Sequence, residues 1–271
     1  MSNRNHSNNI TDLNTDQSAG YTLLVKIGLN SFSYAVTGQG RLLALKENLS
    51  LVELSQTSDS NNMLLSDYEK RIVSIPYRGF TFVPVSLFKP EKVADFARFL
   101  DVKPNEKVIS QPLDADNQVI FKADEFLVDL VIDKFGSNSI VFAPKGWIKL
   151  TAANNPSNHQ LYVNIDGDKA EFLNFSDGKL RFYNSFEFKA ADELAYFAML
   201  VTNELQLSPQ DVILVLSGGI TPEDENGGSL ARFFGKVELN NMNPLVLPAQ
   251  TTSHDILTLT ALSLCGSSEV I

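Results

Sequence analysis

The chain has 271 residues, of which 44% are hydrophobic and 20% charged, and its formal net charge is −10. This composition is typical of a globular protein with one large domain or two lobes, and it excludes a disordered chain. The negative charge repels phosphates and anionic lipids, so we expect neither nucleic acid nor a membrane surface as a partner.

Several further classes of protein are excluded by residues that the sequence lacks. Its only cysteine is Cys265, so neither an internal disulfide nor a cysteine-based zinc site can form. The three histidines are widely separated, and neither a phosphate-binding loop nor a nucleophile elbow is present. No apolar run is long enough to cross a bilayer, and the first residues contain no apolar signal core. We therefore expect a cytoplasmic protein without a bound metal and without direct membrane insertion.

Regular structure is expected to begin after a polar tail. Residues 1–19 are rich in Asn, Ser, Asp and Thr, which predicts a disordered segment. From Tyr21 onward apolar residues alternate and predict two strands, and a third strand follows the turn at residues 37–40, over residues 42–47. The first part of the fold is therefore predicted to be a three-stranded meander.

The same pattern returns in the second half of the chain, across residues 159–188, at a constant offset in residue number. The first copy contains Leu23, Val25, Ile27, Tyr34, Gly40, Arg41 and Leu42, and the second contains Leu161, Val163, Ile165, Phe172, Gly178, Lys179 and Leu180. Hairpins converge on such alternation easily, which leaves a chance match as the alternative. We expect two duplicated lobes, formed by residues 20–155 and 156–271.

Helices and strands alternate through the rest of the chain, which favours layers of α and β structure. Between the meanders, the sequence predicts helices over residues 50–71, 90–100 and 124–135 and around Trp147, strands near Ser74 and over 81–84 and 139–143, and a hairpin at 114–117. The apolar run at residues 80–88 is interpreted as core, with a contact surface as the alternative.

The region after the second meander continues this alternation. A helix is expected over residues 190–207 and a strand over 211–216, and the strand leads into Ser217, Gly218 and Gly219. The next helix is expected to begin at Thr221, or to be delayed by two glycines to residues 229–234. A strand at 237–239 and a helix at 254–265, ended by Gly266, complete the prediction.

Four short segments of this sequence resemble a Bacteroidetes family of actin-like proteins with a domain of unknown function and, more distantly, actin-like pilus-assembly and secretion-platform proteins. The segments are residues 24–28 (LVKIG), 162–166 (YVNID), 192–196 (DELAY) and 215–219 (VLSGG). The resemblance covers roughly residues 21–266. It implies an α/β fold of the actin, hexokinase and Hsp70 superfamily, with duplicated ribonuclease-H-like lobes. Each lobe would have a mixed sheet begun by a three-stranded meander and flanked by helices.

The resemblance also implies that the catalytic residues are missing. In active members each lobe begins with a strand ending in Asp-x-Gly, where the aspartate serves magnesium or water and the glycine amide approaches phosphate. Here the first aspartate position matches Lys26, with Gly28 retained, and the second matches Asn164, with Asp166 at the glycine position. A cation and a misplaced carboxylate at these positions oppose the binding of magnesium and a triphosphate. We therefore expect metal-assisted hydrolysis to be lost.

The resulting interpretation is a non-catalytic actin-like protein, a pseudo-ATPase that acts as a binding or scaffold protein for a protein partner or as a homodimer. The alternative is a nucleotide-binding ATPase or small-molecule kinase with a rearranged cleft between the lobes. In that alternative, ATP and magnesium would be held by Gly28, Ser31, Ser217, Gly218 and Gly219. The two consecutive glycines also have a plainer interpretation, as a tight connection from strand to helix.

Overall fold

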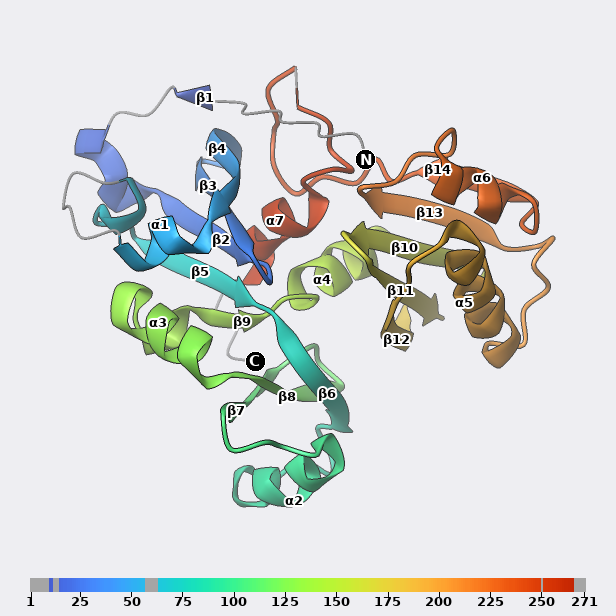
Figure 1. Cartoon of the computed structure of the whole chain (residues 1–271), viewed down its shortest axis with the longest axis horizontal. Helices are drawn as coiled ribbons and strands as arrows, with labels where there is room; N and C mark the ends of the chain where they lie inside the picture. The colour runs from blue at the N-terminus through green and yellow to red at the C-terminus, as the bar shows by residue number, and fades with distance from the viewer. Residues whose placement is uncertain (1–9, 12–14, 57–62, 250, 266–271) are drawn as a thin grey trace. The chain divides into compact units, whose positions relative to one another are not determined.

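The computed structural model describes residues 10–11, 15–56, 63–249 and 251–265, which fall into two compact units, each with its own sheet (Figure 1). Unit 1 contains the described parts of residues 1–146, 244–247 and 259–271, and unit 2 contains those of residues 147–243 and 248–258. Helices and strands alternate in both units, so the predicted α/β class is confirmed.

Unit 1 is built on a mixed six-stranded sheet with the order β1-β4-β3-β2-β5-β9. The strands are β1 (Ile10–Thr11), β2 (Thr22–Ile27), β3 (Ser31–Gly38), β4 (Arg41–Ser50), β5 (Lys70–Ile75) and β9 (Ile140–Phe142). Strands β2, β3 and β4 form the antiparallel meander, and β5 and β9 extend the sheet in parallel. Residues 72–75 of β5 and residues 141–142 of β9 are buried, as expected for parallel strands whose two faces are covered.

The polar segment at residues 1–19 contains structure where the sequence predicted disorder. Ile10–Thr11 forms β1, which pairs antiparallel with β4, and Thr15–Gly20 forms the 3-10 helix η1. Backbone pairing depends little on side-chain polarity, so composition alone did not reveal this contact. The other residues of the predicted tail lie outside the described residues.

A second, three-stranded antiparallel sheet is inserted into unit 1 between β5 and β9. It contains β6 (Tyr77–Pro84), β8 (Asn117–Asp124) and β7 (Glu106–Pro112), with η3 (Pro90–Lys92), α2 (Val93–Ala97) and η4 (Arg98–Leu100) between β6 and β7. Of the apolar run at residues 80–88, Val83 is buried, whereas Val85 and Leu87 are exposed. Phe80 and Phe82 are half-buried, so the interpretation of this run as core holds only for part of its strand and is wrong for the loop that follows.

The remaining helices that come before β10 or after β14 in the chain have between 3 and 11 residues. They are α1 (Leu51–Gln56), η2 (Met63–Leu65), α3 (Glu125–Phe135), η5 (Ser137–Ser139), α4 (Lys145–Ala153), α7 (Leu257–Ala261) and η6 (Leu262–Cys265). The long helix predicted at residues 50–71 is wrong, because β4 continues to Ser50 and β5 already begins at Lys70. Residues 57–62 of that prediction, and the predicted stop at Gly266, lie outside the described residues.

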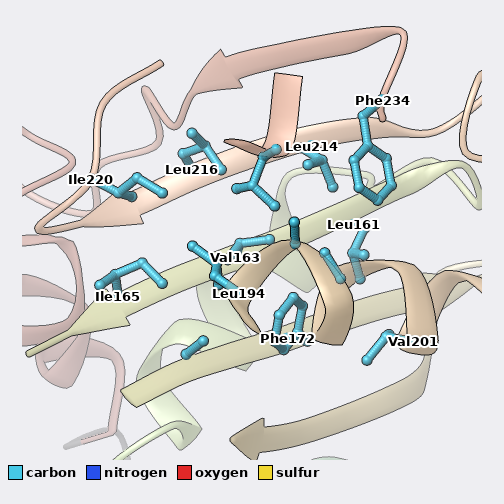
Figure 2. Close-up of a cluster of buried hydrophobic side chains, with 14 of the residues drawn as sticks. Leu161, Val163, Ile165, Phe172, Leu194, Val201, Leu214, Leu216, Ile220 and Phe234 are labelled. Atoms are coloured by element: carbon cyan, nitrogen blue, oxygen red, sulfur yellow. The ribbon is translucent and has the colours of Figure 1, made fainter. Parts of the chain in front are cut away.

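Unit 2 is built on a mixed five-stranded sheet with the order β12-β11-β10-β13-β14. The strands are β10 (Gln160–Asp166), β11 (Lys169–Ser176), β12 (Lys179–Glu187), β13 (Ile213–Gly218) and β14 (Lys236–Leu239). One face of the sheet packs on α5 (Ala191–Glu204), and Figure 2 shows side chains of β10 and β13 lying against that helix. This apolar cluster, which includes Phe172, Leu194 and Leu216, forms the core of unit 2.

Helix α6 (Glu225–Ala231) begins earlier than the two glycines suggested. The Asp224 side chain caps it by accepting a hydrogen bond from the Gly227 amide at 2.8 Å. A β-carbon on Gly227 would lie 1.9 Å from the Thr221 carbonyl oxygen, so only glycine fits between the helix and the preceding turn. Here glycine permits close packing and does not delay the helix.

The predicted duplication is confirmed by the bounds of the strands. In unit 1 the meander strands begin at Thr22, Ser31 and Arg41, and in unit 2 they begin at Gln160, Lys169 and Lys179, so every start is displaced by the same offset. The second turn of each meander contains a glycine with a left-handed φ, 71° at Gly40 and 76° at Gly178. The two sheets therefore repeat one design, and the inserted sheet belongs to unit 1 alone.

Candidate functional site

The candidate residues of unit 1 lie in the first turn of its meander. Gly28 follows β2 and Ser31 begins β3, and the Gly28 amide donates a hydrogen bond of 2.8 Å to the Ser31 carbonyl oxygen. A β-carbon on Gly28 would lie 3.2 Å from that same oxygen, which leaves little room for a larger residue. The amide that would approach a phosphate in an active relative is therefore used to close the turn.

Lys26 lies at the end of the same strand, in place of the aspartate. It faces Ser33 across the antiparallel pair with β3, and Ser74 across the parallel pair with β5. Lys26 is half-buried and Ser74 is almost fully buried. The position thus carries a positive charge beside two hydroxyl groups, so it offers no carboxylate for a metal ion.

In unit 2 the equivalent position forms a buried polar network. The Nδ2 atom of Asn164 donates to Oε2 of Glu171 at 2.9 Å, and the Tyr183 hydroxyl donates to Oε1 of the same carboxylate at 2.7 Å. The Nζ atom of Lys169 lies 3.4 Å from Oε1. Asn164 and Glu171 are both buried, so their hydrogen bonds are shielded from water and the network is fixed in place.

Glu171 is a functional candidate that the sequence reasoning missed. It stands in the middle of the apolar strand β11 and faces Asn164 directly across the pair with β10. The sequence contained one signal for it, a single glutamate between the apolar residues Ala170, Phe172 and Leu173. Such a residue predicts a buried charge with a polar partner, because charged residues are rarely buried without one. The partners themselves come from two neighbouring strands, and only the pairing register identifies them.

The glycine pair of unit 2 is fully engaged by the protein's own backbone. The Gly218 amide donates to the His254 carbonyl oxygen at 2.8 Å, and the Gly219 amide donates to the Ile165 carbonyl oxygen at 3.0 Å. Gly218 has a φ of 78°, and a β-carbon there would lie 2.1 Å from the Ile165 carbonyl oxygen. These contacts support the plainer interpretation, a tight strand-to-helix connection that requires glycine at residue 218.

Ser217 and Asp166 complete the candidate region of unit 2. The Ser217 hydroxyl oxygen accepts a hydrogen bond of 3.0 Å from Nδ2 of Asn240, and both residues are buried. Asp166 is exposed at the end of β10, one residue before Gly167, whose φ is 64°. Asp166 therefore adds a negative charge beside the turn where an active relative has glycine.

The structure brings the candidates together within each unit: Gly28 with Ser31 in unit 1, and Ser217 with Gly218 and Gly219 in unit 2. Among the described residues, no group of three or more His, Cys, Asp or Glu side chains could hold a metal ion. Burial, together with the charge of Glu238, raises the pKa of Tyr162 on β10 to about 12, so this phenol stays protonated at neutral pH. Asn164, Glu171 and Ser217 thus each hydrogen-bond to another side chain of the protein, and the described residues offer no cluster of metal ligands.

Comparison with known proteins identifies the fold. The sequence profile of a family described as "Protein of unknown function (DUF3822)" matches residues 10–237. A Bacteroides thetaiotaomicron protein described as having an actin-like ATPase fold and unknown function is similar in structure, with a TM-score of 0.76 and 20% identity over 93% of this chain and 99% of that one. No curated protein sequence matches the chain.

A second similar structure is that of a "PilM-PilN type IV pilus biogenesis complex". Its TM-score is 0.56 at 15% identity, and the match covers 90% of this chain and 98% of that one. At such identities the likeness shows the fold alone. The resemblance to a family of unknown function with the actin-like ATPase fold is thereby confirmed. No helix among the described residues is long and apolar enough to span a membrane.

Proposed function

We propose that this chain, which belongs to the DUF3822 family, is a non-catalytic pseudo-ATPase of the actin-like fold that acts as a binding or scaffold protein. One observation carries the proposal: the amides of Gly28, Gly218 and Gly219 each donate to a carbonyl oxygen of the protein itself. A phosphate bound through these amides would have to break hydrogen bonds that the fold already makes.

The charges at the aspartate positions support the same proposal. Lys26 repels a magnesium ion, and Asn164 is an amide whose donor is already bound to Glu171. Asp166 adds negative charge to the part of unit 2 where an active relative would receive phosphate, whereas Glu171 is paired with Lys169. At an effective dielectric constant near 20, two unit charges about 4 Å apart interact by about 4 kcal/mol, enough to decide whether a triphosphate binds.

The partner in this proposal is another protein. The similar structure with a TM-score of 0.56 is named as a complex of two pilus-biogenesis proteins, which provides an example of this fold bound to a partner. We further propose a cytoplasmic location, in keeping with a single cysteine in 271 residues.

Calorimetric titration of the whole chain with ATP and magnesium, followed by a phosphate-release assay, tests the proposal. We expect no binding up to millimolar nucleotide and no turnover. The variant Lys26→Asp restores the aspartate that active relatives carry, at a position outside the buried network of Glu171, and it should bind magnesium–ATP more tightly than the wild type.

The control Lys46→Asp makes the same change of charge on β4, outside the candidate residues, and should leave binding unchanged. Thermal unfolding of every variant checks that the fold is retained. Micromolar affinity of the wild type for magnesium–ATP, with turnover, would refute the pseudo-ATPase and favour the alternative of a functional ATPase or kinase.

A further inference from the structure

Helix α4 contains two buried side chains whose polar atoms are not paired with the protein. Trp147 and Thr151 are both fully buried. Across the described residues, neither Nε1 of Trp147 nor Oγ1 of Thr151 has a hydrogen-bond partner. Burying such a group without a partner is unfavourable, and folded proteins pair nearly all of their buried polar atoms with other protein atoms or with ordered water. The two atoms therefore need a partner other than these residues.

The two residues lie on the same face of the helix. They are four positions apart in α4, and side chains at this spacing are neighbours, with β-carbons roughly 5–6 Å apart. Side chains of a helix lean towards its N-terminus, so Thr151 leans over the turn that contains Trp147. One small molecule can therefore contact the indole N–H and the hydroxyl group at the same time.

A second buried threonine shows what Thr151 does not do. Thr202 of α5 is almost fully buried, and its hydroxyl donates to the Ala198 carbonyl oxygen, four residues earlier, at 2.8 Å. This is the usual partner of a threonine within a helix. For Thr151 the equivalent acceptor is the carbonyl oxygen of Trp147, and between these two described residues no such bond forms. The hydroxyl of Thr151 is thus left for another partner.

The indole of Trp147 is held in place by the unit 2 sheet. Its ring lies edge-on to the ring of Tyr183 on β12, with centroids 6.4 Å apart and an angle of 79° between the planes. The Tyr183 hydroxyl in turn donates to Glu171 at 2.7 Å. Packing of this kind fixes the orientation of the ring, so the indole N–H cannot turn out to bulk solvent without losing the contact. Its acceptor must therefore be a molecule that enters the core.

The chemistry of the two atoms selects the ligand. An indole nitrogen only donates, whereas a hydroxyl group donates and accepts, so the ligand has to accept at least one hydrogen bond. An indole N–H offers a metal ion no lone pair. A buried anion needs a cation beside it, and the lysines of α4, Lys145 and Lys149, are each two residues from Trp147 and therefore on other faces of the helix. A neutral water molecule fulfils these conditions and is small enough for a packed core.

We propose that Nε1 of Trp147 and Oγ1 of Thr151 together bind one internal water molecule. The indole N–H donates to the water oxygen, and the water and the hydroxyl group share the second hydrogen bond. Helix α4 follows β9 and precedes β10 in the chain, so the water helps to fix this connecting helix onto the sheet of unit 2. The proposal does not depend on whether nucleotide binds, so it and the proposed pseudo-ATPase can fail separately.

Nuclear magnetic resonance of the whole chain tests the proposal directly. Trp147 is the only tryptophan of the sequence, so it gives a single indole N–H resonance. We expect a nuclear Overhauser effect between this proton and water, with the sign of a water molecule that tumbles with the protein. Absence of that effect in the folded wild type would overturn the proposal.

Thr151→Val removes the hydroxyl group and keeps the branched shape of the side chain. With the water bound as proposed, the variant loses one of its hydrogen bonds, the Overhauser effect at the indole disappears, and the melting temperature falls by about 2–4 °C. If the hydroxyl group had no partner, valine would instead raise the melting temperature, because an unpaired buried polar atom is removed. A raised melting temperature, or an Overhauser effect that persists in Thr151→Val, would contradict the shared water.

Thr202→Val is the matched control, because it removes another buried threonine hydroxyl from a helix of unit 2 and leaves α4 intact. It should leave the Overhauser effect at the indole unchanged. Trp147→Phe is a second variant that removes the other partner of the water. Followed by circular dichroism, the losses of unfolding free energy in Trp147→Phe and Thr151→Val should not add in the double variant, since either change alone removes the same water. Additive losses would overturn the proposal, and the wild-type spectrum still tests it if Thr151→Val fails to fold.

Discussion

The two meanders share their strand starts and their second turn but differ in the polar residues that they contain. Both have a left-handed glycine in the second turn and a bulge in the third strand, at equivalent positions of the two copies. At the positions facing each other across the first two strands, unit 1 has Lys26 and Ser33, whereas unit 2 has Asn164 and Glu171. The geometry of the second turn and the alternation of apolar residues are thus common to the two copies, while the residue at the aspartate position differs between them.

The difference shows how burial decides what a polar residue does. In unit 1 the Ser33 hydroxyl accepts a hydrogen bond from the exposed backbone amide of Asn48 at 3.1 Å. In unit 2 the equivalent Glu171 is buried and bound by two side chains. A buried carboxylate stabilises the fold only while its partners remain, so unit 2 should respond more strongly to mutation at this position.

The largest effect is expected at the end of β13. Gly218→Ala would force a β-carbon to within 2.1 Å of the Ile165 carbonyl oxygen at a φ of 78°, and should destabilise the protein by about 3 kcal/mol or more. The equivalent end of β5 is Ile75, so this requirement belongs to unit 2 alone. Urea unfolding followed by tryptophan fluorescence measures the change.

The neighbouring Gly219 provides the matched control. A β-carbon at Gly219 would lie 4.0 Å from the same oxygen, so Gly219→Ala should change the free energy of unfolding by less than about 1 kcal/mol. Equal losses of unfolding free energy at the two glycines would show that the close approach of residue 218 to the Ile165 carbonyl oxygen does not require glycine.

A smaller effect is expected within the buried network. Glu171→Ala leaves the Asn164 amide and the Tyr183 hydroxyl without their acceptor, and should cost about 2–3 kcal/mol of unfolding free energy. Glu171→Gln keeps one oxygen acceptor and should cost less. Ser33→Ala, the equivalent change in unit 1, should cost less than about 1 kcal/mol because its one hydrogen bond is exposed. If Ser33→Ala cost as much as Glu171→Ala, the contrast between the two units would be wrong.

The smallest effect at neutral pH is expected at Tyr162. Its hydroxyl donates to Oε1 of Gln160 at 2.9 Å, so Tyr162→Phe should change the unfolding free energy by less than about 1 kcal/mol at pH 7. Burial raises its pKa from 10.0 to about 12, and therefore its contribution is fully present below pH 10 and is lost between pH 10 and 12. Thermal unfolding across this range should show a smaller alkaline loss of stability in Tyr162→Phe than in the wild type.

Unit 1 also contains buried tyrosines whose pKa is raised. Burial raises the pKa of Tyr34 and Tyr68 to about 12 as well, so Tyr34→Phe should also reduce the alkaline loss. Absorbance at alkaline pH distinguishes these buried phenols from exposed ones. A wild type whose tyrosines all ionise near pH 10 while still folded would contradict the burial of all three.

The sequence predicted the parts of the fold that local patterns specify. Alternating apolar residues and the turns at Gly40 and Gly178 were sufficient to predict both meanders, because the alternation of a strand and the residues of a turn are local features of the sequence. The same reasoning failed over residues 50–71, where the described part contains only the short helices α1 and η2 and where the two ends, Ser50 and residues 70–71, belong to β4 and β5. There, tertiary pairing overrides the intrinsic preference of the segment.

The candidate site was predicted only in part, for a similar reason. The replacement of aspartate by Lys26 and Asn164 could be predicted from the Asp-x-Gly motif, because its residues are contiguous in the sequence. The contacts of Glu171 and Gly218 depend on which strands pair and in which register, and no local pattern contains that information. Likewise, Gly227 suggested a later start for the helix, whereas close packing against Thr221 is what requires glycine there.

The division of the chain between the units bears on its synthesis. Unit 1 receives its last segments, residues 244–247 and 259–265, after nearly all of unit 2 has been made. One of these segments, η6, contacts β2 and β5, and Leu262 within it is fully buried. At a translation rate of about 5–20 residues per second, this helix is synthesised roughly ten seconds after residue 146, where the first part of unit 1 ends. The lobe that leaves the ribosome first is therefore the last to close its core, and a nascent chain halted within unit 2 would expose that core to chaperones and proteases.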